Sequence, residues 1–297
     1  MAVIELNHVT KMYGTSRGVS DLNLEVNEGE VTGFLGPNGA GKTTTISMLM
    51  DLIRPTSGEI KIFGMDTRKQ GVEVRKRIGF LAGDFALDKD LTGWQQLKYY
   101  GNLRGSFDKA YIQELADRLE CDLSKRFKNL SRGNRQKVGL ISALMHRPEL
   151  LIFDEPTSGL DPLMQAEFNK IIAEHKAAGK TAFISSHVLS EVEALCDNVA
   201  FIREGEIVAT RTMQELTDTA TRYIRVTTKD KKLLDQLGKL SGTKIQSETN
   251  EYTEFTSTGD INTVLGLLAK HKVQNVTITE ADLESIFMHY YQEESNV

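Results

Sequence analysis

The chain has 297 residues, of which 40% are hydrophobic and 26% are charged, and its net charge is −5. This length suits one large domain or two ordinary ones, and the acidic balance argues against a nucleic-acid partner. No apolar run approaches the ~18 residues of a membrane helix, and residues 1–10 do not resemble a secretory signal. Cys121 and Cys196 lie far apart in no metal-like spacing. We therefore expect free thiols in a reducing compartment.

The first part of the chain predicts strands leading into a glycine-rich loop. Residues 2–10 and 19–26 alternate apolar and polar, as half-buried strands do, and residues 31–35 read as a short buried strand. The sequence GPNGAGKT follows at residues 36–43 and fits the phosphate-binding pattern G-x-x-x-x-G-K-[ST], with a helix expected over residues 43–50. A strand before the loop and a helix after it are the context that this motif requires.

Each fixed residue of this loop has a physical role. Gly39 and Gly41 allow a turn tight enough to aim backbone N–H groups at phosphate oxygens. Lys42 adds a positive charge on the outer phosphates, and the Thr43 hydroxyl can coordinate Mg²⁺. The positive end of the following helix also favours an anion. The sequence therefore predicts a phosphate site at this loop.

A helical insert is predicted after two further strands, which we place at residues 59–64 and 78–81. Thr92 is a helix N-cap with Gln95 three residues on, the pattern of a capping box. Helical spacing of apolar residues recurs over residues 111–119 and 138–145. We place this helical subdomain at about residues 85–148.

The next buried strand, residues 150–153, ends in two carboxylates. Strand, helix and strand at residues 150–153, 164–176 and 181–186 indicate a parallel sheet, and residues 198–202 and 205–209 a closing hairpin. The strand places Asp154 and Glu155 at its C-terminal edge, where ligands bind in such sheets. Asp154 is placed to hold Mg²⁺, and Glu155 to orient or deprotonate an attacking water.

After about residue 221 the pattern restarts in the order βαββαβ, which predicts a small ferredoxin-like α+β domain. Strands are expected at residues 223–227, 243–246, 252–256 and 276–278, and helices at 231–240, 261–271 and 281–291.

Four further motifs give the chain a definite resemblance. The sequence DEPTSGLD at residues 154–161, His187 after two serines, Tyr13, and LSRGNRQK at residues 130–137 occur in the order and spacing of ABC transporter nucleotide-binding subunits. The chain resembles this family over residues 2–220. The C-terminal segment of residues 222–297 resembles in length an extension found in the bacterial drug- and antibiotic-export branch of the family. Its ending, Leu283 to Phe287, also resembles that of this branch.

The resemblance implies a role for each matching residue. Glu155, His187 and Lys42 are the expected catalytic residues, with His187 touching the γ-phosphate. Thr43 and Asp154 are expected to hold Mg²⁺. The residues expected to bind ATP are Tyr13, stacked on adenine, then Gly36, Asn38, Gly39, Ala40, Gly41, Lys42, Thr43, Thr44, and Ser131, Gly133 and Asp161.

The resemblance also implies the architecture and the partners. The fold class is α/β, a P-loop NTPase cassette of ABC type over residues 1–220, with a mixed sheet core, an antiparallel β subdomain and a helical subdomain. Residues 221–297 form the ferredoxin-like accessory domain, with a regulatory or a merely stabilising role. ATP is expected between two head-to-tail subunits, where Ser131 and Gly133 of one face the nucleotide of the other. A separate integral membrane permease is expected to export the substrate and to hold this cytoplasmic chain at the inner face of the membrane.

Two departures from the family pattern keep alternatives open. Arg132 and Asn134 replace Gly and Gln of the usual signature Leu-Ser-Gly-Gly-Gln, and Gly83 stands where a Gln usually reaches toward Mg²⁺ and water. A glycine has no side chain for this purpose, so we expect slower or less tightly coupled hydrolysis, unless Asp84 substitutes. An ATP-dependent regulatory clamp with weak hydrolysis and a soluble ABC-type ATPase outside transport remain alternatives. Phe85, Leu87 and Trp94 are candidate contacts with the membrane subunit.

Overall fold

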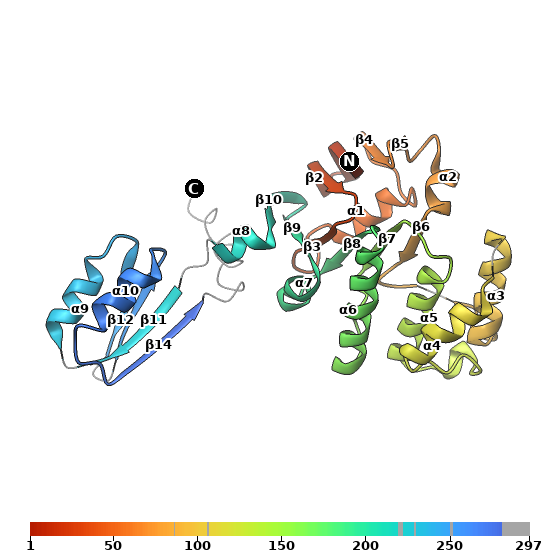
Figure 1. The fold of residues 1–297 in the computed structure, drawn as a ribbon. Helices are drawn as coiled ribbons and strands as arrows, with labels where there is room; N and C mark the ends of the chain where they lie inside the picture. Colours follow the sequence, from red (N-terminus) through yellow and green to blue (C-terminus); the bar gives the residue numbers. More distant parts are fainter. Residues whose placement is uncertain (86, 106, 219–221, 229, 250–251, 281–297) are drawn as a thin grey trace. The chain divides into compact units, whose positions relative to one another are not determined.

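The computed structural model describes residues 1–85, 87–105, 107–218, 222–228, 230–249 and 252–280. Its chain divides into two compact units, Met1–Met213 and Gln214–Val297, whose helices and strands are labelled in Figure 1. None of the helices in these described residues has both the length and the apolar character needed to span a membrane. The helix predicted over residues 281–291 lies outside the described residues.

A six-stranded sheet forms the centre of the first unit. Its strand order is β10-β9-β3-β8-β7-β6, with five parallel strands and β10 antiparallel at the edge. Every residue of β3, β7 and β8 is buried, as expected for parallel strands covered on both faces. The strands are β3 Val31–Leu35, β6 Ile78–Leu81, β7 Leu150–Asp154, β8 Thr181–Ser186, β9 Asn198–Arg203 and β10 Glu206–Thr212.

The register of this sheet decides which residues meet at its edge. Leu35 pairs with Ser186 across β3 and β8, and Asp154 pairs with Ser185 across β7 and β8. The loop that follows Leu35 therefore emerges beside the carboxylates that end β7. Both belong to the C-terminal edge of the parallel strands, where open α/β sheets bind ligands.

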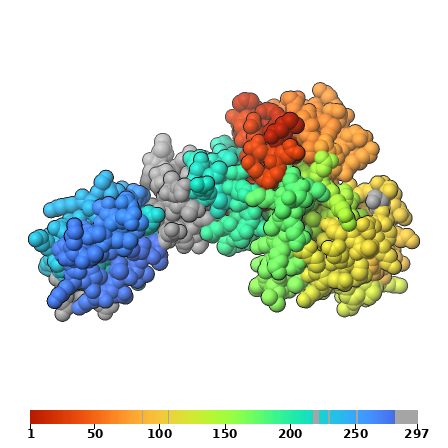
Figure 2. Space-filling view, viewed as in Figure 1, coloured from red at the N-terminus to blue at the C-terminus, as the bar shows by residue number. Residues whose placement is uncertain are grey.

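An antiparallel sheet of order β2-β1-β4-β5 packs with the central sheet on a shared core. Leu22 and Ile62 of this sheet, Phe34 and Ile152 of the central sheet and Ile46 of α1 belong to one cluster of buried side chains. Its elements are β1 Ala2–Tyr13, β2 Ser16–Asn27, β4 Ser57–Ile62 and β5 Met65–Asp66, with α1 Lys42–Leu49. Figure 2 shows this antiparallel sheet, red to orange, and the helical segment of residues 93–144, mainly yellow, over different parts of the surface of the first unit.

The helices follow the predicted pattern with two kinds of difference. Thr92 caps its helix as predicted, accepting from the Gln95 N–H and donating its own N–H to the Gln95 side chain. The helix predicted to begin at residue 138 begins at Arg132 in the structure, where Ser131 caps it. The prediction placed its start too late because the first turns of this helix are polar. Helices α2, α7 and α8 and the 3-10 helix η1 were not predicted. The helices are α2 Gly71–Lys76, α3 Gly93–Arg104, α4 Lys109–Arg118, η1 Phe127–Asn129, α5 Arg132–Leu144, α6 Pro162–Ala177, α7 Leu189–Leu195 and α8 Met213–Asp218.

The second unit contains an antiparallel sheet of order β12-β13-β11-β14, which confirms the ferredoxin-like topology. Its core joins Ile224, Val226 and Phe255 of the sheet to Leu233 of α9 and Val264 of α10. The elements are β11 Arg222–Thr227, α9 Lys231–Gly238, β12 Thr243–Glu248, β13 Thr253–Ser257, α10 Ile261–Leu268 and β14 Asn275–Glu280.

Two partly buried histidines predict how the stability of the first unit depends on pH. Each uses Nε2 on a backbone carbonyl, His146 on Ile78 at 3.0 Å and His175 on Thr181 at 3.2 Å, and burial lowers the pKa of each to about 4. Because the unfolded pKa is ~6.5, the stabilisation is complete above pH 6.5 and declines as pH falls toward 4. At pH 5 we expect a loss of roughly 2 kcal/mol of unfolding free energy per histidine.

Urea denaturation at pH 7.5 and pH 5 measures this loss. The double variant His146→Gln/His175→Gln is the control, and its unfolding free energy should change less between the two pH values. A double variant with the same pH dependence as the parent would contradict the assignment.

Candidate nucleotide site

The phosphate loop connects β3 to α1 and needs glycine at two positions. Gly39 has φ 82° and Gly41 has φ 109°, backbone conformations that other residues rarely adopt. A Cβ at Gly41 would also lie 2.6 Å from Val19 Cγ1, whereas nothing lies within 4 Å of a Cβ at Gly39. The loop is therefore packed against β2 on one side and open on the other, where a ligand can approach its backbone.

Lys42, at the start of α1, is a buried cation directed into this loop. Its side chain is 6% exposed, and Nζ donates to the carbonyls of Gly36 at 2.6 Å and Pro37 at 3.1 Å. Its closest carboxylate oxygen is Glu155 Oε1, at 3.5 Å. An ammonium group held at a helix N-terminus, against an open loop, is suited to an anionic ligand.

Thr43 and Asp154 are brought together as predicted, although they are far apart in the sequence. The Thr43 hydroxyl donates to Asp154 Oδ2 at 2.7 Å, and the Ser185 hydroxyl donates to Oδ1. Asp154 is buried. Among the described residues no group of three or more His, Cys, Asp or Glu could hold a metal ion. One hydroxyl and one carboxylate fit Mg²⁺, which keeps several waters and takes further oxygens from substrate phosphates.

Glu155 lies between two nitrogen-bearing side chains. Its Oε1 is 3.5 Å from Lys42 Nζ and 3.1 Å from His187 Nδ1. The Glu155 and His187 side chains are 26% and 46% exposed, so both can meet a ligand or water. The residues Lys42, Thr43, Asp154, Glu155 and His187 are thus brought together at one edge of the sheet.

Tyr13 lies at the end of β1, next to the phosphate loop. The residue is 51% exposed, and Lys11 Nζ lies 5.2 Å from the ring centroid. A Cβ on Gly18 would be 2.8 Å from the ring, and the Gly18 carbonyl would be 3.3 Å from a Cβ on Gly41. The β1–β2 turn therefore links this exposed aromatic face to the loop, as adenine stacking requires.

Ser131, Gly133 and Asp161 form a separate group at two helix starts. Ser131 Oγ accepts from the Asn134 N–H at 3.3 Å and caps α5, and Asp161 Oδ1 accepts from two N–H groups and caps α6. Gly133 lies against the carbonyl of Gly159. Among the described residues no hydrogen bond or ion pair joins these three to the phosphate loop. The structure thus places these three residues at the starts of α5 and α6.

A polar network next to the site, centred on Glu191, was not predicted from the sequence. The Glu191 carboxylate, on α7, accepts from Thr157 Oγ1 at 2.7 Å and from Ser186 Oγ at 2.6 Å. It therefore joins the segment after Glu155 to the segment before His187. Ser185, bonded to Asp154, was also missed. The polar pair at residues 185–186, ending a buried strand, is the signal that could have revealed Ser185.

Gly83 follows β6, at the position where the family resemblance predicts a glutamine. A Cβ built on Gly83 would be 3.2 Å from Asp154 Oδ2 and 3.4 Å from Asp154 Cγ. Gly83 itself is exposed. A longer side chain here would start beside the predicted metal ligand.

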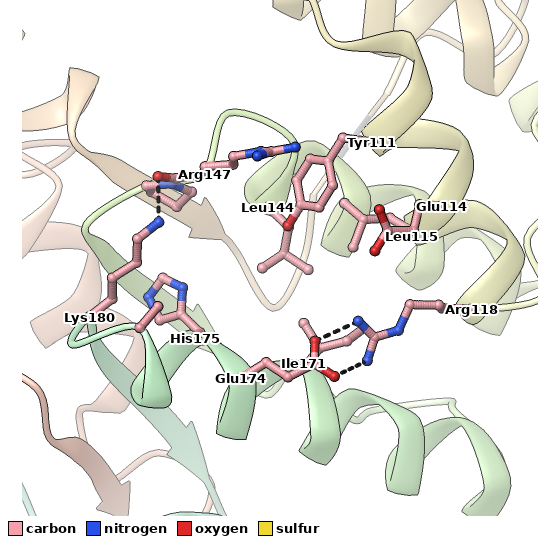
Figure 3. Close-up of a pocket in the computed structure, with 12 residues that line it drawn as sticks. Tyr111, Glu114, Leu115, Arg118, Leu144, Arg147, Ile171, Glu174, His175 and Lys180 are labelled. Carbon is pink, nitrogen blue, oxygen red and sulfur yellow. Dashed lines mark hydrogen bonds and ion pairs between the residues drawn. The ribbon is translucent and has the colours of Figure 1, made fainter.

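A pocket lies between the helices α4 and α5 on one side and α6 on the other, and it shares no residue with the phosphate loop (Figure 3). Arg118 of α4 spans it, donating to Glu174 and Glu167 of α6 at 2.6–2.8 Å, and lowers the pKa of Glu167. Arg147 stacks on Tyr111, with the guanidinium carbon 4.1 Å from the ring centroid. These paired charges hold the helical segment against α6.

Known proteins resemble this chain in sequence and in fold. Residues 19–158 match the family described as ABC transporter. The chain is 43% identical over 209 residues to the bacitracin transport ATP-binding protein BcrA of Bacillus licheniformis, covering 69% of this chain and 68% of the relative. It is 33% identical to BcrA of Enterococcus faecalis over 296 residues, covering 96% and 95%.

Solved structures agree. An ATP-binding subunit of an ABC transporter has a TM-score of 0.65 and 27% identity, covering 72% of this chain and 91% of that one. A dimeric bacterial ABC transporter cassette also has a TM-score of 0.65, with 24% identity, covering 71% of this chain and 98% of that one. This similarity supports the fold.

The fold and site define a P-loop ATPase cassette, as predicted. The chain belongs to the family of ABC transporter ATP-binding proteins. It is an ATP-binding, ATP-hydrolysing transport subunit, and this confirms the predicted class and enzyme activity.

The position of Gly83 yields a test of the missing glutamine. We expect Gly83→Gln to raise the ATP hydrolysis rate, because its Cβ would lie 3.2 Å from Asp154 Oδ2 and its amide would extend from there toward the proposed Mg²⁺ and water. Gly83→Ala is the matched control, since it adds the Cβ without the amide and should give no rise. Steady-state phosphate release measures both. A Gly83→Gln rate at or below that of the parent would contradict the hypothesis.

Proposed function

We propose that the site assembled by the phosphate loop, Asp154, Glu155 and His187 binds ATP with Mg²⁺ and hydrolyses it to drive export. The observation that carries the proposal is the hydrogen bond from Thr43 to Asp154, with Glu155 held beside it between Lys42 and His187. Bound Mg²⁺ would supply charge neutralisation at the phosphates, held by Thr43 and Asp154. The backbone and side chains from Gly36 to Thr44 would bind the phosphates.

Glu155, Lys42 and His187 divide the remaining work. The Glu155 carboxylate orients the attacking water and accepts its proton, because it is partly exposed and follows Asp154 directly. Lys42 balances the charge of the outer phosphates from its buried position. His187, 3.1 Å from Glu155, contacts the γ-phosphate and so reports whether ATP or ADP is bound. Tyr13 offers its exposed ring to adenine.

We propose that two copies of this chain bind ATP between them. Ser131 and Gly133 lie at the start of α5, and the N-terminus of a helix favours a phosphate. In one chain these residues are separate from the phosphate loop. A head-to-tail pair brings the start of α5 in one copy to the loop of the other, with Asp161 near the interface. Binding of ATP would then close the dimer and hydrolysis would release it.

The transported class follows from the relatives. Two of them are named bacitracin transport proteins, and one of these aligns over 96% of this chain. We therefore propose export of an antibiotic-like substrate through a separate membrane subunit, to which this chain binds at the cytoplasmic face. Phe85, Leu87 and Trp94 are partly buried and remain candidate contacts. Residues 221–297 are proposed as an accessory domain outside the nucleotide chemistry.

Removing the proposed base tests the catalytic assignment. Glu155→Gln should lower the ATP hydrolysis rate by about 10²–10⁴-fold, because the amide cannot accept the proton. Glu149→Gln is the matched control, since Glu149 pairs with Arg77 just before β7, away from the site. Phosphate release measures the hydrolysis rate. Light scattering in the presence of ATP and Mg²⁺ measures the molar mass and so shows whether the protein is a dimer. A Glu155→Gln protein that hydrolyses ATP at the parent rate would refute the role of Glu155.

Mixing two inactive variants tests the shared site. Lys42→Ala and Ser131→Arg should each lose hydrolysis as pure proteins. In a mixed dimer the intact loop of one copy meets the intact α5 start of the other. An equal mixture should recover about a quarter of the parent rate, because half of the dimers are mixed and each contains one complete site. Unchanged inactivity of the mixture, with mixed dimers demonstrated by affinity tags, would exclude the shared site.

A further inference from the structure

Gln136, on the second turn of α5, is a buried side chain that touches the backbone of the proposed base. It is 6% exposed. Its Nε2 donates to the carbonyl of Pro156 at 2.8 Å and to that of Glu155 at 3.3 Å. A buried carboxamide that uses both hydrogens on neighbouring carbonyls fixes the position of those carbonyls.

The backbone of Glu155 needs such support. Its φ is 49°, in the left-handed region that residues with a side chain rarely adopt. Its N–H lies 3.2 Å from the Ser185 carbonyl and 3.1 Å from the Ser185 hydroxyl, and its carbonyl also accepts from the Ser158 N–H at 3.2 Å. Ser185 therefore holds the residue from the sheet side, and Gln136 from the side of α5. The conformation of this turn sets where the Glu155 carboxylate points.

The start of the same helix touches the same segment at two more points. Arg132 Nη2 donates to Ser158 Oγ at 2.9 Å. A Cβ on Gly133 would lie only 2.5 Å from the Gly159 carbonyl oxygen, so the two backbones are in close contact. Arg132 is thus engaged within its own chain. Helix α5 and residues 155–159 form one connected piece.

We propose that Gln136 is a positioning residue for ATP hydrolysis, which holds the Glu155 carboxylate in its working orientation and ties it to the start of α5. The proposal rests on the proposed function, in which Glu155 activates water and the start of α5 meets the nucleotide of a second copy. A displacement of the α5 start would reach the Glu155 backbone through the Gln136 carboxamide. Each copy would then adjust its own base to the nucleotide bound by its partner.

The variant that tests this is Gln136→Met, which keeps the length of the side chain and removes both N–H donors. Glu155 would still be present but less well placed, so kcat should fall by about 10- to 100-fold, the usual effect of a small misplacement. The KM for ATP and the affinity for a fluorescent ATP analogue should stay within about twofold, since no phosphate contact is lost. If Gln136 only stabilised the fold, the variant would instead contain a smaller fraction of protein able to bind the ATP analogue.

Gln165→Met is the matched control. Gln165 Nε2 also donates to a carbonyl of this region, that of Leu160 at 3.4 Å, but it lies on α6 and does not touch Glu155. Its kcat should stay near that of the parent. If Gln136→Met folds poorly, Gln136→Leu is the second variant, since it is apolar, has a similar volume and lacks the donors. Parent-like kcat in a folded Gln136 variant, or an equal loss in Gln165→Met, would overturn the inference.

Glu155→Gln, measured alongside, separates this inference from the proposed function. Parent-like turnover of Glu155→Gln would show that the assignment of the base is wrong. Loss of turnover in Glu155→Gln, together with normal kcat in Gln136→Met, would overturn the positioning role alone. Loss of kcat in both, at unchanged KM in Gln136→Met, is the result we expect.

Discussion

The site depends on one hydrogen bond between residues that are 111 positions apart. The Thr43 hydroxyl donates to Asp154 at 2.7 Å and joins the phosphate loop to the end of β7. This contact exists because β3 and β7 both pair in parallel with β8, which brings their C-terminal ends to one edge. The entirely buried rows of β3, β7 and β8 keep that pairing rigid. The core therefore sets the geometry at which the loop and the carboxylate can share a metal.

The chemistry next to this bond uses conformations that folding alone would not favour. Glu155 has a positive φ, and Lys42 is buried with backbone carbonyls as its partners at 2.6 and 3.1 Å. Strained residues and buried charges of this kind concentrate at functional sites. Here the neighbours compensate, because Ser185 and Gln136 hold the Glu155 backbone and Glu155 lies near the Lys42 ammonium.

Local patterns allowed much of this to be predicted from the sequence. The phosphate loop, the Thr92 cap and the βαββαβ order of the second unit are each carried by short stretches whose residue types have direct physical meaning. The start of α5 was placed six residues late, because residues 132–137 show no apolar periodicity and the cap at Ser131 is the only signal. Contacts such as Glu191 with Thr157, or Gln136 with Pro156, depend on the tertiary fold, and no local pattern encodes them.

The most direct test is a crystal structure of Glu155→Gln bound to ATP and Mg²⁺. We expect two copies head to tail, with the γ-phosphate contacted by Lys42 and His187 of one copy and by Ser131 and Gly133 of the other. The metal should touch Thr43 and lie close to Asp154. A nucleotide bound within a single copy would exclude the shared site, and one placed away from the edge where Thr43 meets Asp154 would exclude the proposed nucleotide site.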